Sequence, residues 1–380
     1  MPNAKATAPG MPPDPHQQQR PYRTMPLPRR SLLALAAGGG LAAGIRPPRP
    51  AHSMPAPRRV IIDTDTATDD ALALLLALNA PSLTIEAITI VVGNVEFDQE
   101  VRNALYTLQV AGAGGRFPVH PGTARPLLRE THRTATWIHG HDGMSDSNFP
   151  PPVQKPETEG GVDAMIRLVR RYPGEITIIA LGALTNVAMA FLRDPELPRL
   201  VRDVVFMGGF HDFHGNVTPA ATYNLWVDPE AARIVLRSGA RLTSVGFDAS
   251  VRASVLDDGD FARIAAMETD LSRFFLRISR MRRAFCKQHQ KMAGPNEPDG
   301  LTVAVAVDPT IGTLMLPRAA DIETQGDLTR GMMVVDELDT SGRPPNVTMC
   351  ADADTARFKA LVFDALRGGV VQARGPTGRS

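Results

Sequence analysis

The sequence holds only two cysteines in 380 residues, Cys286 and Cys350. So few thiols exclude a disulfide scaffold and a cysteine-based zinc site. Either both thiols are buried, or they form a single bridge in a chain that is exported to an oxidising compartment. An excess of charge of either sign is also missing, because 41 Lys and Arg residues stand against 40 Asp and Glu residues. A field that attracts nucleic acid or an anionic membrane is therefore excluded, and a small, neutral partner is favoured.

A long apolar run is missing near the N-terminus as well. RRSLLALAAGGGLAAG, from Arg29 to Gly44, is too short to span a bilayer, which takes about 20 apolar residues. Its arginine pair and the small residues of AHS at 51–53 resemble a twin-arginine export signal. We predict an export signal in a disordered, Pro-rich leader over residues 1–53, a folded domain over 54–370 and a disordered tail over 371–380. The protein would then be periplasmic or extracellular, without stable membrane insertion. A cytoplasmic protein with a disordered basic leader is the alternative.

From about Arg58 onward, short apolar runs alternate with longer helical segments. RVII precedes DDALALLLAL, LTIEAITIVVG precedes a helical segment over 97–111, and EITIIALG precedes LTNVAMAFL. The short runs are continuously apolar, which is typical of strands that are covered on both faces. The pattern predicts an α/β fold, a single domain with a mostly parallel central sheet flanked by helices. Residues 265–292 are expected to be helical and to cover a site as a cap.

The stretch VIIDTDTATDD, at residues 60–70, gathers four aspartates where the first strand ends and its helix begins. Asp63 and Asp65 point to the same side of an extended chain. With Thr68 as the expected N-cap, Asp69 and Asp70 fall in the first helical turn. Helix capping leaves the repulsion at Asp63 and Asp65 uncompensated, whereas a bound hard cation, Ca²⁺ or Mg²⁺, would remove it. Such an ion would also orient a water molecule whose proton a neighbouring aspartate can take.

At these residues the chain resembles the inosine–uridine-type nucleoside hydrolases, which cleave the N-glycosidic bond of ribonucleosides with a bound Ca²⁺. The resemblance continues in order over about residues 58–367. It is carried by AITIVVGN, WIHGHDG, LGALTN, FMGGF, GNVTPAATYNLWVDPEAA and PDGLTVAVAVDP. It implies a nucleoside-hydrolase-like fold with a Rossmann-like core, a small-molecule nucleoside as substrate, and a homodimer or homotetramer, as is common among relatives.

The resemblance also implies roles for individual residues. One Ca²⁺ per chain would be held by Asp65, Asp70, the Leu181 carbonyl and Asp299. Asp65 would in addition be the general base that activates a Ca²⁺-bound water, and Asp63 would support it. Ribose would be bound by Asp69, Asn94, Met207, Asn216 and Asn224. The implied reaction is hydrolysis of a ribonucleoside to free base and ribose, through an oxocarbenium-like transition state and without a covalent nucleophile.

The chain departs from the family pattern at three places, of which the last two concern the sugar and the leaving group. Thr66 and Ala67 replace a Pro-Gly pair, Thr222 replaces a ribose-binding glutamate, and Pro298 replaces a histidine. The absence of the glutamate removes a charge-assisted hydrogen bond to the sugar. The absence of the histidine removes a candidate proton donor for the departing base.

Other side chains could replace that donor. His139, in WIHGHDG, and His289, in the predicted cap, are both candidates on the leaving-group side. The basic residues of the same cap are expected to form a solvated helix face. They are Arg282, Arg283, Lys287 and Lys291.

Two other interpretations remain open. A phosphatase of the haloacid-dehalogenase type also begins with an apolar strand and Asp-x-Asp, but it usually has Thr or Val where Ala67 stands, and it has no place for the Asp69-Asp70 pair. An exported, Ca²⁺-containing protein that binds a nucleoside or another pentoside without turnover would explain Thr222 and Pro298. The complete set of aspartates argues against it, because a binder has less need of a general base beside a metal.

Overall fold

The computed structural model describes residues 57–130 and 132–368. The predicted leader over residues 1–53 and the predicted tail over 371–380 lie outside the described residues. In the part of the chain that the structure describes, no helix is long and apolar enough to cross a membrane.

Within the described residues, nine strands form one sheet in the order β3-β2-β1-β4-β5-β6-β9-β7-β8. From β3 to β9 in this order every neighbouring pair is parallel, and β7 and β8 at the far edge are antiparallel. This arrangement confirms the predicted α/β fold with a mostly parallel sheet. The strands are β1 (Arg58–Thr64), β2 (Leu83–Ile90), β3 (Val119–Pro121), β4 (Ile176–Ala180), β5 (Asp203–Met207), β6 (Leu242–Val245), β7 (Gly312–Ile322), β8 (Met333–Asp336) and β9 (Val347–Ala353).

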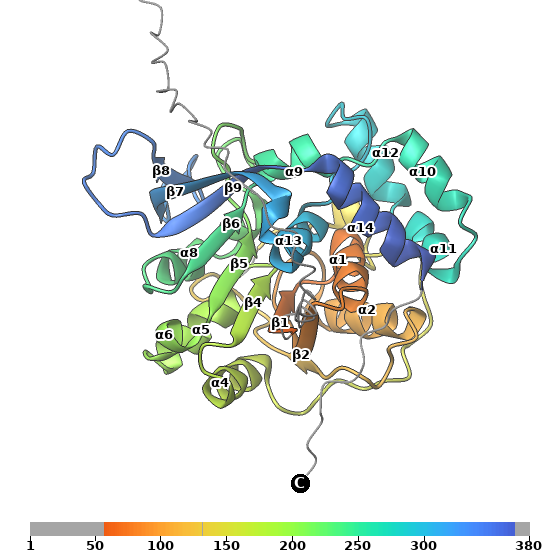
Figure 1. Cartoon of the computed structure of the whole chain (residues 1–380), viewed down its shortest axis with the longest axis horizontal. Coiled ribbons are helices and arrows are strands. Elements are labelled where there is room, and N and C mark those ends of the chain that lie inside the picture. Colours follow the sequence, from red (N-terminus) through yellow and green to blue (C-terminus); the bar gives the residue numbers. More distant parts are fainter. Residues whose placement is uncertain (1–56, 131, 369–380) are drawn as a thin grey trace, which may run out of the picture. The chain divides into compact units, whose positions relative to one another are not determined.

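Helices cover both faces of the sheet (Figure 1). One hydrophobic cluster is built largely from α1 (Thr68–Leu78), α2 (Phe97–Val110), α10 (Asp258–Ala265), α11 (Asp270–Ile278), α13 (Pro298–Val307) and α14 (Thr355–Arg367). The opposite cluster is built from α4 (Gly161–Arg171), α5 (Thr185–Arg193), α6 (Leu197–Leu200) and α8 (Pro229–Leu236). The remaining helical elements are α3 (Thr136–His139), α7 (Tyr223–Val227), α9 (Phe247–Ala253), α12 (Arg280–Gln288) and the 3-10 turn η1 (Pro309–Ile311).

Strand β1 shows why its sequence is continuously apolar. Val60 and Ile62 belong to the cluster around α1, whereas Ile61 belongs to the cluster around α5. Successive side chains of a strand point to opposite faces, so a strand between two helical layers has no solvated side. Its polar residues therefore lie at its two ends, Arg58 and Arg59 at the half-buried start and Asp63 and Thr64 at the buried carboxyl end.

The junction between β1 and α1 differs in one detail from the prediction. The N-cap is Ala67 and not Thr68, which is the first helical residue. Alanine has no capping oxygen, and the Thr68 hydroxyl is engaged with His139 Nδ1 at 2.7 Å. Asp70 supplies a substitute contact, because its Oδ2 accepts the backbone N–H of Ala67 at 3.0 Å. The placement of Asp69 and Asp70 in the first helical turn is confirmed.

The two cysteines are free and buried, so the alternative of a single disulfide bridge was wrong. Burial raises the pKa of Cys286 to about 11 and that of Cys350 to about 12. Both thiols are therefore protonated and serve as small core residues. The predicted cap over residues 265–292 is helical, but it is divided into α11 and α12.

Candidate active site

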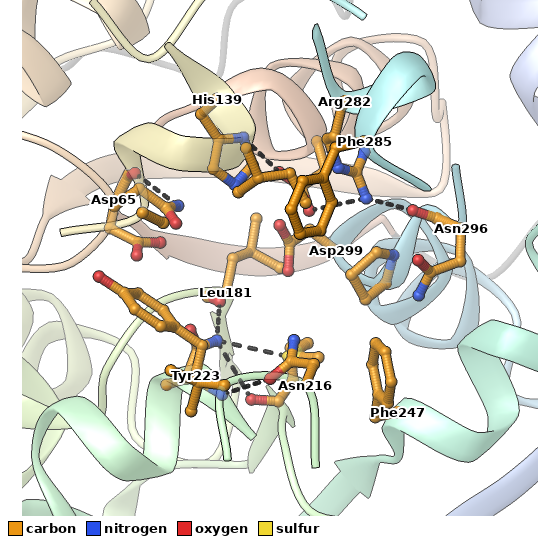
Figure 2. A pocket seen from close by; sticks show the side chains of 18 of the residues that line it. Asp65, His139, Leu181, Asn216, Tyr223, Phe247, Arg282, Phe285, Asn296 and Asp299 are labelled. Atoms are coloured by element: carbon orange, nitrogen blue, oxygen red, sulfur yellow. Dashed lines mark hydrogen bonds and ion pairs between the residues drawn. The ribbon is translucent and has the colours of Figure 1, made fainter. Parts of the chain in front are cut away.

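A pocket opens at the carboxyl ends of the parallel strands (Figure 2). Residues at the carboxyl ends of five strands, or in the segments that follow them, line it: Asp65, Asn94, Leu181, Met207 and Phe247. Ligands of open parallel sheets bind outside this edge. The pocket also contains the predicted residues Asp69, His139, Asn216, Asn224 and Asp299. Sequence segments more than 200 residues apart are thus brought together, as the resemblance implied.

A cluster of buried carboxylates forms the floor of the pocket. One carboxylate oxygen from each of Asp69, Asp70 and Asp299 lies within 4.8 Å of the others. Burial, and then repulsion from Asp70, raises the pKa of Asp65 well above its ordinary value. Burial and the charge of Asp69 act in the same way on Asp299, and raise the pKa of Asp70 to about 6. Such a set of acids needs positive charge in order to be ionised together.

Two oxygens of this cluster suit a cation directly. Asp65 Oδ2 and Asp69 Oδ1 are buried without a hydrogen-bond partner. An unpaired buried carboxylate oxygen is costly unless it meets a cation or a ligand donor. Carboxylates and a main-chain carbonyl are the donors that Ca²⁺ prefers, so the residues present fit a hard cation.

The carboxylates that lie closest together are only partly the metal ligands that the resemblance implied. Asp70 and Asp299 belong to the close group, but its third member is Asp69, to which the resemblance gives a sugar-binding role. Asp65 lines the pocket and interacts with Asp70, which is buried behind the lining. The Leu181 carbonyl accepts a hydrogen bond from Asn224 Nδ2, and a carbonyl oxygen has a second lone pair for an ion.

Asp63 and Asn94 hold the cluster from behind. Asp63 lies at the end of β1, and its Oδ1 accepts hydrogen bonds from Thr89 Oγ1 at 2.5 Å and Asn186 Nδ2 at 2.7 Å. Burial nevertheless raises the pKa of Asp63 to about 7. Asn94 Nδ2 donates to the Asp65 carbonyl at 3.1 Å and to Asp70 Oδ2 at 3.2 Å. Both side chains therefore fix the junction between β1 and α1, which carries Asp65 and Asp70.

Amide groups line the opposite wall. Asn216 Oδ1 accepts the backbone N–H of Tyr223 at 2.8 Å, which fixes the amide and leaves its Nδ2 toward the pocket. Asn224 Nδ2 also approaches Met207 Sδ at 3.4 Å. Thr222 does not line the pocket: it is buried, and its Oγ1 accepts the Gly209 N–H at 3.0 Å. The hydroxyl thus does not replace the glutamate that the family pattern has there.

The two candidate histidines differ in position. His139 is buried and lines the pocket, with Nδ1 engaged by Thr68 and 3.8 Å from Asp69 Oδ1. Burial lowers the pKa of His139 to about 4, although the charge of Asp69 acts in the opposite direction. His289, at the C-terminal end of α12, is exposed and packs its ring against Phe285 at 4.9 Å outside the pocket lining. The structure therefore brings only His139 to the site.

Arg282 is the functional residue that the sequence analysis placed wrongly. It was expected on a solvated helix face, but its side chain is 5% exposed and lines the pocket. Arg283 and Lys287, by contrast, do form surface ion pairs with Asp258. The available signal was spacing: Arg282 lies four residues before the buried Cys286, on the same helix face.

The mouth of the pocket is both aromatic and polar. Phe285 from α12 and Phe247 from α9 line it (Figure 2). Pro298, the first residue of α13, belongs to the same lining. Gln290, just after α12, adds an amide whose Oε1 is buried without a hydrogen-bond partner. This wall can therefore stack against a flat ring and accept a hydrogen bond from it.

Comparisons with known proteins agree with this geometry. The family model described as inosine-uridine preferring nucleoside hydrolase matches residues 60–360. The probable uridine nucleosidase 2 of Arabidopsis thaliana is 33% identical over 317 residues, which cover 81% of this chain and 97% of the relative. A solved plant nucleoside hydrolase is similar with a TM-score of 0.77 at 31% identity, covering 82% of this chain and 100% of its own. A purine-preferring ribonucleoside hydrolase from Gardnerella vaginalis has a TM-score of 0.76 at 30% identity, covering 82% and 98%.

Fold and site together define a hydrolase of N-glycosidic bonds, with buried carboxylates at the carboxyl edge of a parallel sheet. The chain belongs to the inosine-uridine preferring nucleoside hydrolase family. Its substrates are ribonucleosides.

Proposed function

We propose that this chain hydrolyses ribonucleosides to free base and ribose with one Ca²⁺ held by Asp65, Asp70, the Leu181 carbonyl and Asp299. The observation that supports this most directly is the buried carboxylate cluster at the pocket, where Asp65, Asp69 and Asp299 belong to the lining and Asp65 and Asp69 have unpaired oxygens. When bound, the ion would lower the pKa of the attacking water and neutralise the clustered charge.

Asp65 is the proposed general base. Its Oδ2 is free of hydrogen bonds, and it lies on the loop directly after β1. Burial and the neighbouring Asp70 favour the protonated form of Asp65 in the metal-free protein, so its function as a base depends on cationic charge beside it. Its carboxylate and that of Asp69 also stabilise positive charge that develops on the sugar ring.

The proposed sugar contacts come from the amide wall and from Asp69. Asp69 Oδ1 has no partner and can accept a sugar hydroxyl. The amides of Asn216 and Asn224, beside Met207, line the same pocket. Holding the ring at several points fixes the anomeric carbon against the attacking water.

His139 is the proposed contact to the departing base from the α3 side, through Nε2, since Nδ1 is engaged by Thr68. The relatives named above differ in the nucleoside that their names carry, uridine in one and purines in the other. The base preference of this chain therefore depends on its own Phe285, Gln290 and Asn296.

A Ca²⁺-containing binding protein without turnover is the second candidate. It is supported by Pro298, where the family has a histidine, and by the withdrawal of Thr222 from the pocket. The two candidates make opposite predictions for product release, although both predict nucleoside binding.

Release of reducing sugar from purine and pyrimidine ribonucleosides, with Ca²⁺ and then with a chelator, tests the proposal. Release that the chelator abolishes is the expected result, and the same panel ranks the substrates. If the folded, Ca²⁺-loaded protein binds nucleosides in calorimetry but releases no sugar, the binding role replaces the enzymatic one.

Export and oligomerisation are further proposals. The Arg29-Arg30 pair and the small residues at 51–53 support an exported protein. Fractionation of cells that produce the full chain, with and without an Arg29→Lys/Arg30→Lys change, tests export. A homodimer or homotetramer is proposed from the family resemblance, and sedimentation of the purified chain tests it.

A further inference from the structure

Arg282 makes a charge bridge between the cap and the sugar side of the pocket. Its Nη1 donates to Glu297 Oε2 at 2.8 Å, and its Nη2 donates to the Asn296 carbonyl and lies 3.2 Å from Asp69 Oδ2. Figure 2 shows the guanidinium of Arg282 pointing from α12 toward Asn296, beside Asp299. The three partners come from α1 and from the segment that leads into α13.

The two oxygens of Asp69 are consequently in different situations. Oδ2 faces the guanidinium of Arg282, whereas Oδ1 is buried without a hydrogen-bond partner in the pocket. An ion pair at one oxygen of a carboxylate favours the orientation in which the other oxygen points away from the guanidinium. The unpaired oxygen, which lies 3.8 Å from His139 Nδ1, is the acceptor of Asp69 that no group among the described residues satisfies.

Glu297 is an anchor for this bridge and not a further pocket residue. Its side chain has no exposed surface, and its backbone N–H donates to Ser254 Oγ at 2.9 Å. It does not line the pocket, although Asn296 and Pro298 on either side of it do. Arg282 is thus fixed from behind by Glu297 and contacts Asp69 in front.

The helix that carries Arg282 is itself fixed to the loop after α3. The backbone N–H of Met281 donates to Ser145 Oγ at 3.1 Å, and Arg280 Nη2 donates to the Ser145 carbonyl at 2.9 Å. The same loop follows His139, which is bonded to Thr68 in the first turn of α1. The position of α12 is therefore transmitted to α1 through His139 and through Arg282.

We propose that Arg282 is a positioning residue for catalysis: it holds Asp69 Oδ2 so that Oδ1 stays directed at a ribose hydroxyl. This inference rests on the proposed function, because it assigns the acceptor of the sugar. A guanidinium suits the task, since its planar fork reaches three acceptors at once. Without it, Asp69 would face Asp70 and Asp299 without the ion pair that offsets their repulsion.

The test compares Arg282→Met and Arg282→Lys with Arg283→Met. Arg283 is the matched control, an arginine at the next position of α12 whose partner is Asp258 on the surface. Each variant is assayed for kcat and KM on a ribonucleoside and on its 2′-deoxy and 3′-deoxy counterparts. Melting curves establish that each variant is folded, and Glu297→Gln, which weakens the bridge while keeping the guanidinium, is the second variant if Arg282→Met does not fold.

Arg282→Met should lower kcat/KM for the ribonucleoside by about tenfold or more. The reason is that Asp69, once released by Arg282, no longer holds the hydrogen bond from the ribose hydroxyl to its charged oxygen. The loss should be much smaller for the deoxynucleoside that lacks the hydroxyl bound by Asp69. Arg282→Lys should recover part of the activity, and Arg283→Met should leave it unchanged. An equal loss on all three substrates would show that Arg282 has only a structural role and would overturn the proposal.

A double-mutant cycle adds a second criterion. If Arg282 acts through Asp69, the Asp69→Asn/Arg282→Met pair should be no slower than Asp69→Asn alone. Additive losses overturn the proposal. Should the parent chain release no sugar, the proposed hydrolase function fails, and the same comparison is then made by calorimetry with a C-nucleoside, whose carbon–carbon bond is not hydrolysed. Weaker binding of the C-nucleoside to Arg282→Met, but not of its deoxy form, still supports the positioning role, and unchanged binding contradicts it.

Discussion

Gly93 and Asp65 approach so closely that no side chain fits between them. A Cβ atom at Gly93 would lie 1.8 Å from Asp65 Oδ2, and one at Gly182 would lie 2.8 Å from Asp65 Oδ1. Real Cβ atoms are not found at such distances from another heavy atom. The backbone after β2 and after β4 therefore encloses the carboxylate of Asp65, and glycine is required for this close approach.

Gly93→Ala should consequently displace Asp65 and abolish sugar release. The cost to folding should be about 1–3 kcal/mol, as for other overpacked sites. Steady-state kinetics and denaturant melts measure both effects. Gly114→Ala is the matched control, since its Cβ would meet nothing nearer than Gln109 Cα at 3.7 Å, and it should leave both quantities unchanged. Wild-type activity in Gly93→Ala would refute the placement of Asp65.

Asp65→Asn should lower kcat by about 10²–10⁴-fold, the usual contribution of a general base. The metal-free variant should melt at a higher temperature than the parent, because a buried acid beside Asp70 has been removed. Activity and stability would thus change in opposite directions. Calorimetric melting in chelator and initial rates in Ca²⁺ measure the two effects, and a variant that keeps full activity would exclude Asp65 as the base.

Local sequence was sufficient for the first strand, its helix and the aspartates between them. Val60 to Ile62 and the leucines of α1 are apolar because both faces of β1 are covered, and this produces an unambiguous pattern. The joining of Asp69 with Asp299 could not be derived in this way, because 229 residues separate them. Only the resemblance to a known family indicated that contact.

Other features lacked a local signal. Arg282 lies in RMRRAFCKQ, where four of nine residues are basic, and only contacts with Asp69 and Glu297 distinguish it from Arg283. The antiparallel strand β7, which lies between β9 and the edge strand β8, is partly exposed and contains Pro317, so it lacks the apolar run of the parallel strands. Thr68 was predicted as the N-cap because a threonine hydroxyl can accept a backbone N–H of the first helical turn. In the structure this hydroxyl is hydrogen-bonded to His139.

Asp63 should contribute to the pH dependence of stability in the metal-free protein. Burial raises its pKa to about 7 in the folded state, above the ordinary value near 4. The folded chain therefore binds more protons there, and the Asp63 contribution to stability falls as pH rises from about 4 to about 7. In Asp63→Asn, the amide oxygen can take the place of Oδ1 and accept the hydrogen bonds from Thr89 and Asn186. The amide nitrogen then takes the place of Oδ2, which has no hydrogen-bond partner in the described part of the chain.

In chelator, the melting temperature of Asp63→Asn relative to the parent should thus rise with pH between pH 5 and pH 7 and be constant above. Other titratable groups contribute equally to the stability of both chains, so their contributions cancel in the difference. They include His139, whose lowered pKa makes its contribution to stability rise with pH. A difference that does not vary with pH would mean that Asp63 is ionised throughout.

Calcium should stabilise the parent chain through Asp299. A ligand at about 100 times its Kd adds about 2.7 kcal/mol to the stability of the folded state. Asp299→Asn removes one acid of the close cluster, at the first turn of α13, and most of the Ca²⁺-dependent rise in melting temperature should be lost. Titration with Ca²⁺ during thermal melting checks this. An unchanged rise would place the ion elsewhere.

Gln290 should control which base is accepted. Its Oε1 lines the pocket without a partner, so a base that donates a hydrogen there gains a contact that other bases lack. Gln290→Met keeps the length and removes the amide. It should lower kcat/KM about tenfold for the favoured nucleoside, and leave p-nitrophenyl riboside, whose aglycone has no N–H, unaffected. Gln288→Met, at an exposed position of α12, is the control. If Gln290→Met lowers the rate on the nitrophenyl riboside equally, Gln290 acts on the shape of the cap and not on the base.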